Sequence, residues 1–435
     1  MSDKPIINSL LQTDFYKLPM DWFGLKHLKD VEVVYRFINR TTSVRLADII
    51  DIGELREQLD HVRTLKFTRD DLHWIAGTYE YDQKFMFPPE FIEFLKDLSL
   101  PEYHLEKKDG QFILEFPGPE PYSSNWEIPA LTIVNTLLNR ARMKGMTRSE
   151  VDALYSEGKI RLAQNIREIK RYSSLIAKHV EKNPKFAFTF SDFGTRRCFS
   201  PEWQDYVVEM MAEELPQEFR GTSNCYLAKK HGLTAMGTVA HQPIMIMAAL
   251  AGDDDDKLRQ ASYEFCRLWA ETFGQGLRII LPDTYGSEPF WEQAPFWLST
   301  WRGFRGDSGD LFMEGTRGVK WFQKNGADLT EKLYIPSDGL LLPLMFKLHK
   351  HFAGRIITSD SIPTTDGWGS SLTNNMTNWE VFKPVSIVVK PASANGYPTV
   401  KLSNNISKAM GEKKDIERCK RVFKYTSNYN QAPTY

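Results

Sequence analysis

The sequence predicts an α/β fold in which a barrel of alternating strands and helices follows a smaller region of helices and antiparallel strands. From Lys185 onward, apolar segments of four to six residues alternate with helical stretches, which is typical of βα units and of a parallel sheet. About six or seven such units in succession favour a closed barrel over an open sheet. The chain of 435 residues is also long enough for two domains at roughly 150 residues each.

The first 125 residues mix helical and strand patterns, and we assign residues 1–125 to an N-terminal α+β domain. Alternating valines and aromatic residues predict a strand over 31–40. The segment QFILEF lies between two Pro-containing segments and predicts a hairpin. Helices are expected over 8–20, 47–61 and 69–79. A cluster of Pro, Gly and Ser over 117–129 marks the boundary to the next domain.

Residues 126–380 are assigned to the barrel domain. Helices over 127–142 and 159–180 precede its first strand. The predicted strands are KFAFTF, a short strand that leads into GTSN, the segment 234–239, and then LRIILP, WRGF, KLYIP and GRIIT. Residues 381–435 are expected to supply strands and a tail that pack on the N-terminal domain.

Small, acidic and basic residues follow these strands. SDFGTRR follows KFAFTF, RGDSGD follows WRGF, SDGL follows KLYIP, and SDSIPTTDGWGSSLTNN follows GRIIT. In α/β barrels, ligands gather at the carboxyl ends of the strands. Backbone N–H groups and arginines bind phosphate oxygens, and carboxylates bind hydroxyl groups or Mg²⁺. This combination predicts a sugar-phosphate site at one end of the barrel.

His241 lies near the end of the stretch Gly221–Pro243, where a strand gives way to the apolar run Pro243–Ala251. A histidine in such a place is more often a hydrogen-bonded core residue than a catalytic one, so its spacing alone leaves both interpretations open. The acidic run AGDDDDK has a simpler interpretation. We expect it to be a solvated charge run before a helix and not a metal site.

The overall composition argues against some classes of function. A net charge of -1 and a pI of about 6.8 disfavour a general nucleic-acid or anionic-membrane surface. The 4 cysteines form no CxxC pair, and no apolar run approaches the roughly 20 residues of a membrane span. The N-terminal residues MSDKPIINSL also lack the pattern of a secretory signal. We therefore expect a cytoplasmic protein with no nucleic-acid partner and no membrane partner.

Together, the motifs resemble those of the nicotinate phosphoribosyltransferases, which are type II phosphoribosyltransferases. The resemblance spans nearly the whole chain and is carried by TDFYKLPM, YRFINR, DFGTRR, GTSNCYLAKKHGLTAMGTVAH, LPDTY, RGDSGD, SDGL, GWGSSLTN, and KPVSIVVKP leading to KLSNNISKAMG. It implies an irregular α/β barrel, an N-terminal α+β domain and a homodimer with shared active sites. The implied reaction joins nicotinate to phosphoribosyl pyrophosphate (PRPP), and releases pyrophosphate and nicotinate mononucleotide for NAD salvage. ATP is the implied co-substrate, acting through a phosphohistidine, and Mg²⁺ accompanies PRPP and ATP.

The resemblance also implies roles for individual residues. His241 matches the phosphorylated histidine, Asp307 matches a residue that grips the ribose, and Arg305 matches a residue at the nicotinate site, so these three are the expected catalytic residues. Substrate-binding positions are expected at Tyr16, Phe193, Arg196, Thr238, Arg305, Ser308, Gly309, Asp338, Gly339, Gly369 and Ser370. In relatives, the tyrosine that matches Tyr16 reaches the site of the neighbouring subunit. No residue is assigned as a metal ligand.

These residue types suit the implied chemistry. Nicotinate is a flat ring with a carboxylate, so the faces of Tyr16 and Phe193 can hold the ring while the guanidinium of Arg305 binds the carboxylate. Such an arginine disfavours nicotinamide, which carries no charge. At the ribose, loss of pyrophosphate develops positive charge, which a carboxylate such as Asp307 stabilises.

Several residues depart from the family pattern. Gln242 follows the histidine where Glu is common, which removes a charge beside His241 and leaves the coupling to ATP open. The glycine loop reads DGWGSSLTNN, which places Trp368, Ser370 and Asn375 at positions where the family has other residues. Two alternatives therefore remain: a phosphoribosyltransferase that acts on nicotinamide or quinolinate, and a catalytically weak regulatory paralogue.

Overall fold

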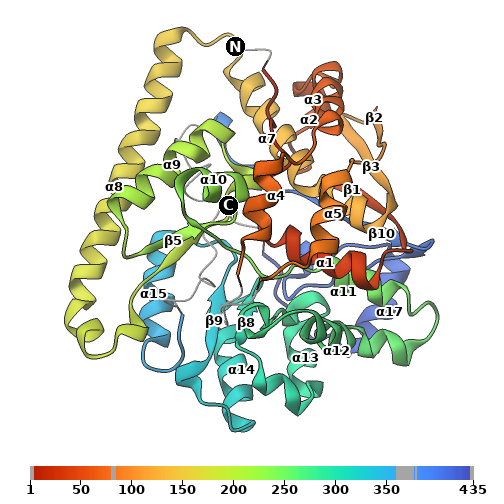
Figure 1. The fold of residues 1–435 in the computed structure, drawn as a ribbon, viewed down its shortest axis with the longest axis vertical. Helices are drawn as coiled ribbons and strands as arrows, with labels where there is room; N and C mark the ends of the chain where they lie inside the picture. The colour runs from red at the N-terminus through yellow and green to blue at the C-terminus, as the bar shows by residue number, and fades with distance from the viewer. Residues whose placement is uncertain (1–3, 80–84, 359–376, 378–379, 432–435) are drawn as a thin grey trace.

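A computed structural model describes residues 4–79, 85–358, 377 and 380–431 of the chain. These residues form a five-stranded antiparallel sheet and two three-stranded parallel sheets. Figure 1 shows the N-terminal elements, in red and orange, gathered in the upper right of the molecule, with the parallel strands and their helices below and to the left. The predicted α/β fold class is confirmed, and the antiparallel sheet combines N-terminal strands with strands from the end of the chain.

The antiparallel sheet contains strands from both ends of the chain, in the order β11, β10, β1, β3, β2. Its strands are β1 (Glu32–Asn39), β2 (His104–Lys108), β3 (Gln111–Pro119), β10 (Ile387–Ala394) and β11 (Tyr397–Pro398). In β1, every second residue from Val33 to Phe37 is buried, as the alternating sequence predicts. The predicted hairpin is β2 and β3, and its turn, Asp109-Gly110, has positive φ at both residues, as a type I′ turn requires.

The helices of the N-terminal part include two that were not predicted, over 89–97 and 120–123, and two of the predicted helices differ in their extent. The helices are α1 (Lys17–His27), α2 (Leu46–Ile49), α3 (Ile52–Thr64), α4 (Arg69–Ala76), α5 (Pro89–Asp97) and α6 (Glu120–Ser123). The helix predicted over 8–20 begins only at Lys17, because the backbone before it pairs with the barrel: Phe15 N–H donates to the Ser223 carbonyl at 2.6 Å. The helix predicted over 47–61 is two helices, because Asp51 caps a new one by accepting from Glu54 N–H.

The barrel is built from two separate parallel sheets. β4 (Phe190–Asp192), β5 (Phe219–Thr222) and β6 (Thr234–Ala235) form one, and β7 (Ile279–Ile280), β8 (Gly303–Gly306) and β9 (Leu333–Pro336) form the other. The strands are shorter than predicted, since KFAFTF contributes only Phe190 and GRIIT contributes a single bridge from Ile357 to Leu333. Strands β8 and β9 lie so close that a side chain at Gly303 would overlap the backbone of Leu333.

Helices surround the two parallel sheets. They are α7 (Glu127–Met143), α8 (Arg148–Lys182), α9 (Pro201–Glu214), α10 (Cys225–His231), α11 (Gln242–Ala249), α12 (Asp255–Thr272), α13 (Ser287–Gln293), α14 (Leu311–Lys324), α15 (Leu342–Phe352) and α17 (Lys413–Phe423). The long helix α8 runs down the left edge of Figure 1 and begins earlier than predicted, because Thr147 and Glu150 form a capping box. The acidic run AGDDDDK spans the start of α12, since Asp254 caps that helix and the last three residues of the run lie in its first turn.

One continuous apolar core extends from the antiparallel sheet into the barrel, and it includes Tyr35, Trp126, Trp269 and Phe304. The two parts of the chain therefore share their interior, and the boundaries at residues 125 and 380 stay a prediction. The 4 cysteines are all buried and unpaired. Within the described ranges, no helix combines the length and the apolar character needed to cross a membrane.

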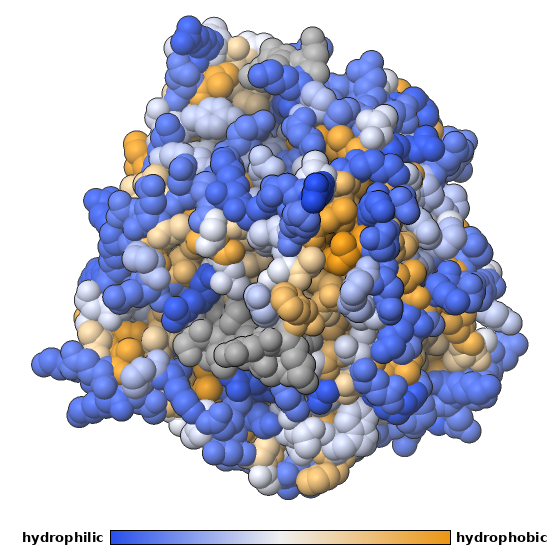
Figure 2. Space-filling view, in the orientation of Figure 1, coloured by the Kyte–Doolittle hydropathy of each residue, from blue (hydrophilic) through white to orange (hydrophobic). Residues whose placement is uncertain are grey.

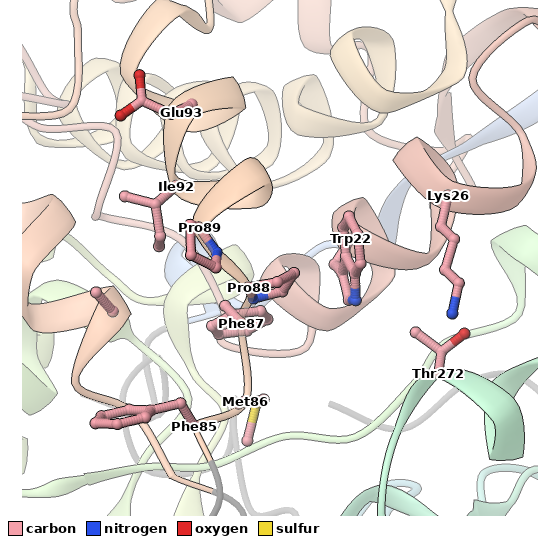
Figure 3. A pocket seen from close by; sticks show the side chains of 11 residues that line it. Trp22, Lys26, Phe85, Met86, Phe87, Pro88, Pro89, Ile92, Glu93 and Thr272 are labelled. Carbon is pink, nitrogen blue, oxygen red and sulfur yellow. The ribbon is translucent and has the colours of Figure 1, made fainter.

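A separate hollow of about 660 Å³ lies between α1, the segment 85–88 and α5. Figure 3 shows its wall of Trp22, Phe85, Phe87 and Pro89, with the ammonium of Lys26 at one side. In Figure 2, hydrophobic surface is visible right of centre, in the region where Figure 1 places α4 and α5. The residues that line this hollow include none of the predicted substrate-binding residues.

Two buried carboxyl groups, Glu120 and Asp21, lie where α6 meets α1. Burial raises the pKa of Glu120 to about 8, and the neighbouring Asp21 adds to the shift. The hydroxyl of Tyr35 donates to Glu120 at 3.3 Å, and the hydroxyl of Ser124 donates to Asp21 at 2.7 Å. Glu120 is therefore protonated in the folded protein at neutral pH.

We expect Glu120→Gln to remove a pH dependence of stability. The folded protein holds the Glu120 proton up to about pH 8, whereas the unfolded chain releases it near its ordinary pKa of 4.5. Unfolding between these two pH values therefore releases a proton, so the free energy of unfolding falls as the pH rises. Thermal unfolding from pH 5 to 8 should show wild type losing a few degrees of Tm relative to Glu120→Gln. Parallel curves for the two proteins would contradict a protonated Glu120, because Asp21 is common to both.

Candidate active site

The loops after the barrel strands bring His241 and Asp307 into direct contact. His241 is the N-cap of α11, and its side chain is buried. Its Nε2 lies 2.9 Å from Asp307 Oδ2, and its Nδ1 lies 2.9 Å from the Thr284 hydroxyl. Since Asp307 is ionised, Nε2 carries the proton and donates it, and Nδ1 accepts from Thr284. Burial lowers the pKa of His241 to about 4, with the charge of Lys401 acting in the same direction, so the imidazole is neutral at neutral pH.

Asp307 is the centre of this group of contacts. Its Oδ1 accepts from Arg305 Nη2 at 2.5 Å and from the Ser337 hydroxyl at 3.2 Å. Burial alone would raise the pKa of Asp307, but Arg305, the hydrogen bond from His241, and Lys401 hold it well below its usual range. Asp307 is therefore a carboxylate across the physiological pH range.

Arg305 holds the RGDSGD loop against two neighbouring strand ends. Besides Asp307, its guanidinium donates to the Ser337 hydroxyl at 2.8 Å and to the Val239 carbonyl at 3.1 Å. Val239 follows Thr238, which is also buried. Arg305 thus fixes the relative positions of the loops after β6, β8 and β9.

Asp283 is a site residue that the sequence analysis did not single out, although its motif LPDTY was noted. Its Oδ2 accepts from the Ser308 hydroxyl at 2.5 Å, and its Oδ1 lies 3.7 Å from His241 Nε2. This Oδ1 is buried and has no hydrogen-bond partner among the described residues. The ligand atoms of His241, Asp283 and Asp307 all lie within 4.8 Å of one another, so a metal ion could bind between the two carboxylates.

The C-terminal segment closes this end of the barrel. The backbone N–H of Asn404 donates to the Ser308 hydroxyl at 3.0 Å. The Asn404 side chain packs against Gly309, whose φ of 82° favours glycine. Lys401 lies 3.9 Å from Asp307, and Lys408 donates to Asp338 at 2.5 Å. Asp338 is followed by Gly339, whose φ is 58°.

Three cations therefore lie at this end of the barrel that the sequence analysis missed: Lys401, Lys408 and Arg40. Both lysines are buried, and the guanidinium of Arg40 donates to the Lys408 carbonyl at 3.0 Å. Burial lowers the pKa of Lys401, and the carboxylates of Asp283 and Asp307 oppose that shift. Both lysines lie in the motif KLSNNISKAMG, but nothing in the spacing of that motif indicates that it returns to the barrel.

Tyr16 and Arg196 form a second group, next to Gly237, which precedes Thr238 in the chain. The Arg196 guanidinium lies 5.7 Å from the centre of the Tyr16 ring, and its Nε lies 3.3 Å from Asp14 Oδ2. The backbone of Tyr16 passes so close to Gly237 that a β-carbon there would lie 2.7 Å from Tyr16 N. Phe193, in the loop after β4, is half-buried.

Tyr16 packs against its own chain. Its side chain is only 3% exposed and lies against Arg196 of that chain, whereas the resemblance implies a tyrosine that reaches the site of the neighbouring subunit. The physical reason is the pairing of Asp14 and Phe15 with Asn224 and Ser223, which draws this segment onto the barrel of the same chain.

Gln242 also lies differently from the expectation. Its side chain does not lie beside the His241 imidazole but donates to Glu127, a buried carboxylate at the start of α7. The side chains of His241 and Gln242 thus contact different parts of the protein: Thr284 and Asp307 in the barrel, and Glu127 in α7. Gly369 and Ser370, together with Trp368 and Asn375, lie outside the described residues.

Comparisons with known proteins agree with the motifs. The sequence profile of the nicotinate phosphoribosyltransferase (NAPRTase) family matches residues 188–427, and the profile of the NAPRTase N-terminal domain matches residues 11–135. The solved structure of nicotinate phosphoribosyltransferase from Vibrio cholerae superposes with a TM-score of 0.81 at 26% identity, covering 97% of this chain and 94% of that one.

A second solved structure, nicotinate phosphoribosyltransferase from Porphyromonas gingivalis, superposes with a TM-score of 0.79 at 25% identity, covering 97% of this chain and 100% of that one. The likeness thus includes both the antiparallel sheet and the barrel. With both family profiles matched and the strand-end loops converging, the chain belongs to the nicotinate phosphoribosyltransferase family.

Proposed function

We propose that the protein condenses nicotinate with PRPP, releases pyrophosphate and nicotinate mononucleotide, and couples this reaction to ATP hydrolysis through phosphorylation of His241. The observation that carries the proposal is the contact of His241, Asp307 and Arg305 at one end of the barrel, with buried lysines beside them. Family membership supports the reaction class, and the remaining steps follow from the charges and contacts of these residues.

Asp307 would stabilise the ribose as the bond to pyrophosphate breaks. Positive charge develops on the sugar in that step, and an ionised carboxylate fixed by Arg305 and Ser337 needs no reorganisation to meet it. Ser308 and Gly309, next to Asp307, would approach the ribose through backbone N–H groups. Gly339, Gly369 and Ser370 are proposed to bind the ribosyl phosphate, and Asp338 to lie beside it.

Lys401, Lys408 and Arg40 would balance the negative charge of pyrophosphate and of the ATP phosphates. A lysine whose pKa is lowered by burial gains from an arriving anion, because the anion restores the charge that burial disfavours. Mg²⁺ fits the neighbouring carboxylates, since Asp283 Oδ1 is buried without a hydrogen-bond partner among the described residues. Asp283 and Asp307 would hold the ion, which would supply further positive charge for the departing pyrophosphate.

Nicotinate would bind on the Tyr16 side of this group. Tyr16 and Phe193 are proposed to contact the two faces of the ring, with Thr238 at its edge. Arg305 and Arg196 both offer a guanidinium for the carboxylate. Arg305 already binds Asp307 and the Val239 carbonyl, whereas Arg196 forms an ion pair with Asp14. A base site lined by two arginines favours an acid over an amide.

Phosphorylation of His241 requires a neutral imidazole, and the low pKa of His241 supplies it at neutral pH. The unprotonated ring nitrogen, Nδ1, would attack the γ-phosphorus of ATP. The bond from that phosphorus to the β,γ-bridging oxygen breaks, and ADP leaves. The Nε2 proton can then pass to Asp307. Hydrolysis of the phosphohistidine then returns inorganic phosphate and completes the coupling. A cytoplasmic homodimer remains part of the proposal, and in such a dimer Tyr16 would serve the site of its own chain.

A substrate panel tests the proposed function. Pyrophosphate release is measured with PRPP and either nicotinate, nicotinamide or quinolinate, each with and without ATP. We expect nicotinate to be used at least about 100-fold more efficiently in kcat/KM than nicotinamide, because the amide leaves the arginine charge unpaired. ATP should increase the rate with nicotinate. Equal use of nicotinamide would contradict the base preference, and release with none of the three would favour a regulatory paralogue.

A further inference from the structure

We propose that Glu127 is a positioning residue that fixes Tyr16 and His241 relative to each other. The proposal rests on the proposed function, because it assigns Tyr16 to the base and His241 to ATP. Tyr16 is the N-cap of α1 and His241 is the N-cap of α11. The next residue in each helix, Lys17 in α1 and Gln242 in α11, directs its side chain to the same carboxylate, that of Glu127.

The contacts of Glu127 connect four elements. Its Oε2 accepts from Gln242 Nε2 and lies 3.6 Å from Lys17 Nζ, and its Oε1 accepts from Lys390 Nζ at 2.7 Å. Glu127 itself is the first residue of α7, and Lys390 lies in the middle of β10. A single carboxylate therefore joins the first turns of α1, α7 and α11 to strand β10.

The charges around Glu127 make this arrangement stiff. The side chains of Glu127, Lys17 and Lys390 are 1%, 0% and 9% exposed, so solvent screens their attraction only weakly. Glu127 also lies in the first turn of α7, where the helix dipole favours a negative charge. Although burial would raise it, the charges of Lys390, Lys17 and Arg196 lower the pKa of Glu127 to about 2. Glu127 therefore remains ionised over the physiological pH range.

The contacts of Glu127 with Lys17 and with Gln242 predict different kinetic effects. Lys17 adjoins Tyr16, so loss of the Lys17–Glu127 contact should loosen the wall of the base site. Gln242 adjoins His241, so loss of the Gln242–Glu127 contact should disturb the alignment of the imidazole with ATP. A misplacement of about 1 Å at a reacting group can reduce the rate about 100-fold. A carboxylate that only supports the fold would change stability and would not separate the two effects.

The experiment compares Lys17→Met, Gln242→Ala and Glu127→Gln, with Asp71→Asn as the control. Asp71 is also a buried carboxylate bound to a lysine, Lys229 at 2.8 Å, but it lies in α4 outside the site. KM for nicotinate, KM for PRPP, the stimulation by ATP, and Tm are measured for each protein, with pyrophosphate release as the assay.

We expect Lys17→Met to raise KM for nicotinate about tenfold and to leave KM for PRPP and the ATP stimulation unchanged. Gln242→Ala should reduce the ATP stimulation about tenfold and leave KM for nicotinate within about twofold. Glu127→Gln should show both changes, and Asp71→Asn neither, even if its Tm falls.

Uniform losses in Lys17→Met and Gln242→Ala, or changes in Tm alone, would overturn the inference. If Glu127→Gln does not fold, Lys17→Met and Gln242→Ala still test whether the two contacts have separate kinetic effects. A wild-type protein that releases no pyrophosphate would refute the proposed function instead, so the two failures are distinguishable.

Discussion

Asp307→Asn is expected to lower kcat for nicotinate mononucleotide synthesis by about 100- to 1,000-fold, the range found when one preorganised electrostatic group is removed from an active site. The amide is the same size as the carboxylate but carries no charge for the ribose in the transition state. It also leaves Arg305 and Lys401 without the anion they share. Steady-state kinetics with nicotinate and PRPP, read as kcat and KM separately, measures the effect.

A matched control for Asp307→Asn lies three residues away in the same loop. Asp310 is exposed and caps α14 by accepting from the N–H groups of Phe312 and Met313. Asn is as good an N-cap as Asp, so Asp310→Asn should keep both its stability and its kcat close to wild type. A loss of kcat below about tenfold in Asp307→Asn would contradict a role for this charge in the transition state.

His241→Gln is expected to abolish the retention of phosphate from γ-labelled ATP and to remove the stimulation of synthesis by ATP. The amide can still occupy the space between Thr284 and Asp307, but it has no nitrogen nucleophile to accept a phosphoryl group. Acid-labile label on the protein, measured after rapid filtration with and without PRPP, reports the step directly.

His231→Gln is the control for this variant, because His231 also contacts a carboxylate, Asp205 at 2.6 Å, and lies in the same motif of the sequence. It should retain label as wild type does. Equal label on wild type and His241→Gln would rule out His241 as the phosphorylated residue. Label without any ATP stimulation would show that phosphorylation and synthesis are uncoupled in this protein.

The sequence predicted the fold class and the place of most strands, because alternating apolar residues and polar strand ends are local patterns. It overestimated the strand lengths in the barrel, since an apolar run such as KFAFTF indicates burial but not hydrogen bonding to a neighbour. The helix predicted over 8–20 failed for a related reason. The backbone of Phe15 has a distant partner, Ser223, that no local pattern reveals.

The site was less predictable than the fold. Motif spacing indicated that His241 and Asp307 lie at strand ends, and in the structure they are in contact, while their roles stay predictions. The direction of the Gln242 side chain and the return of Lys401 to the barrel depend on contacts between residues more than 90 positions apart. Periodicity carries no information about such contacts, so only the folded chain shows them.

The position of β10 beside β1 has a consequence for how the protein is made. Pairing of these strands joins residues 32–39 to residues 387–394. The edge of β1 that faces away from β3 therefore has no partner until nearly the whole chain has left the ribosome. At about 5 to 20 residues per second, translation leaves that edge open for roughly 20 to 70 seconds. During this time the nascent chain exposes a β-edge that can pair with other chains, which makes chaperone protection valuable while the barrel is being synthesised.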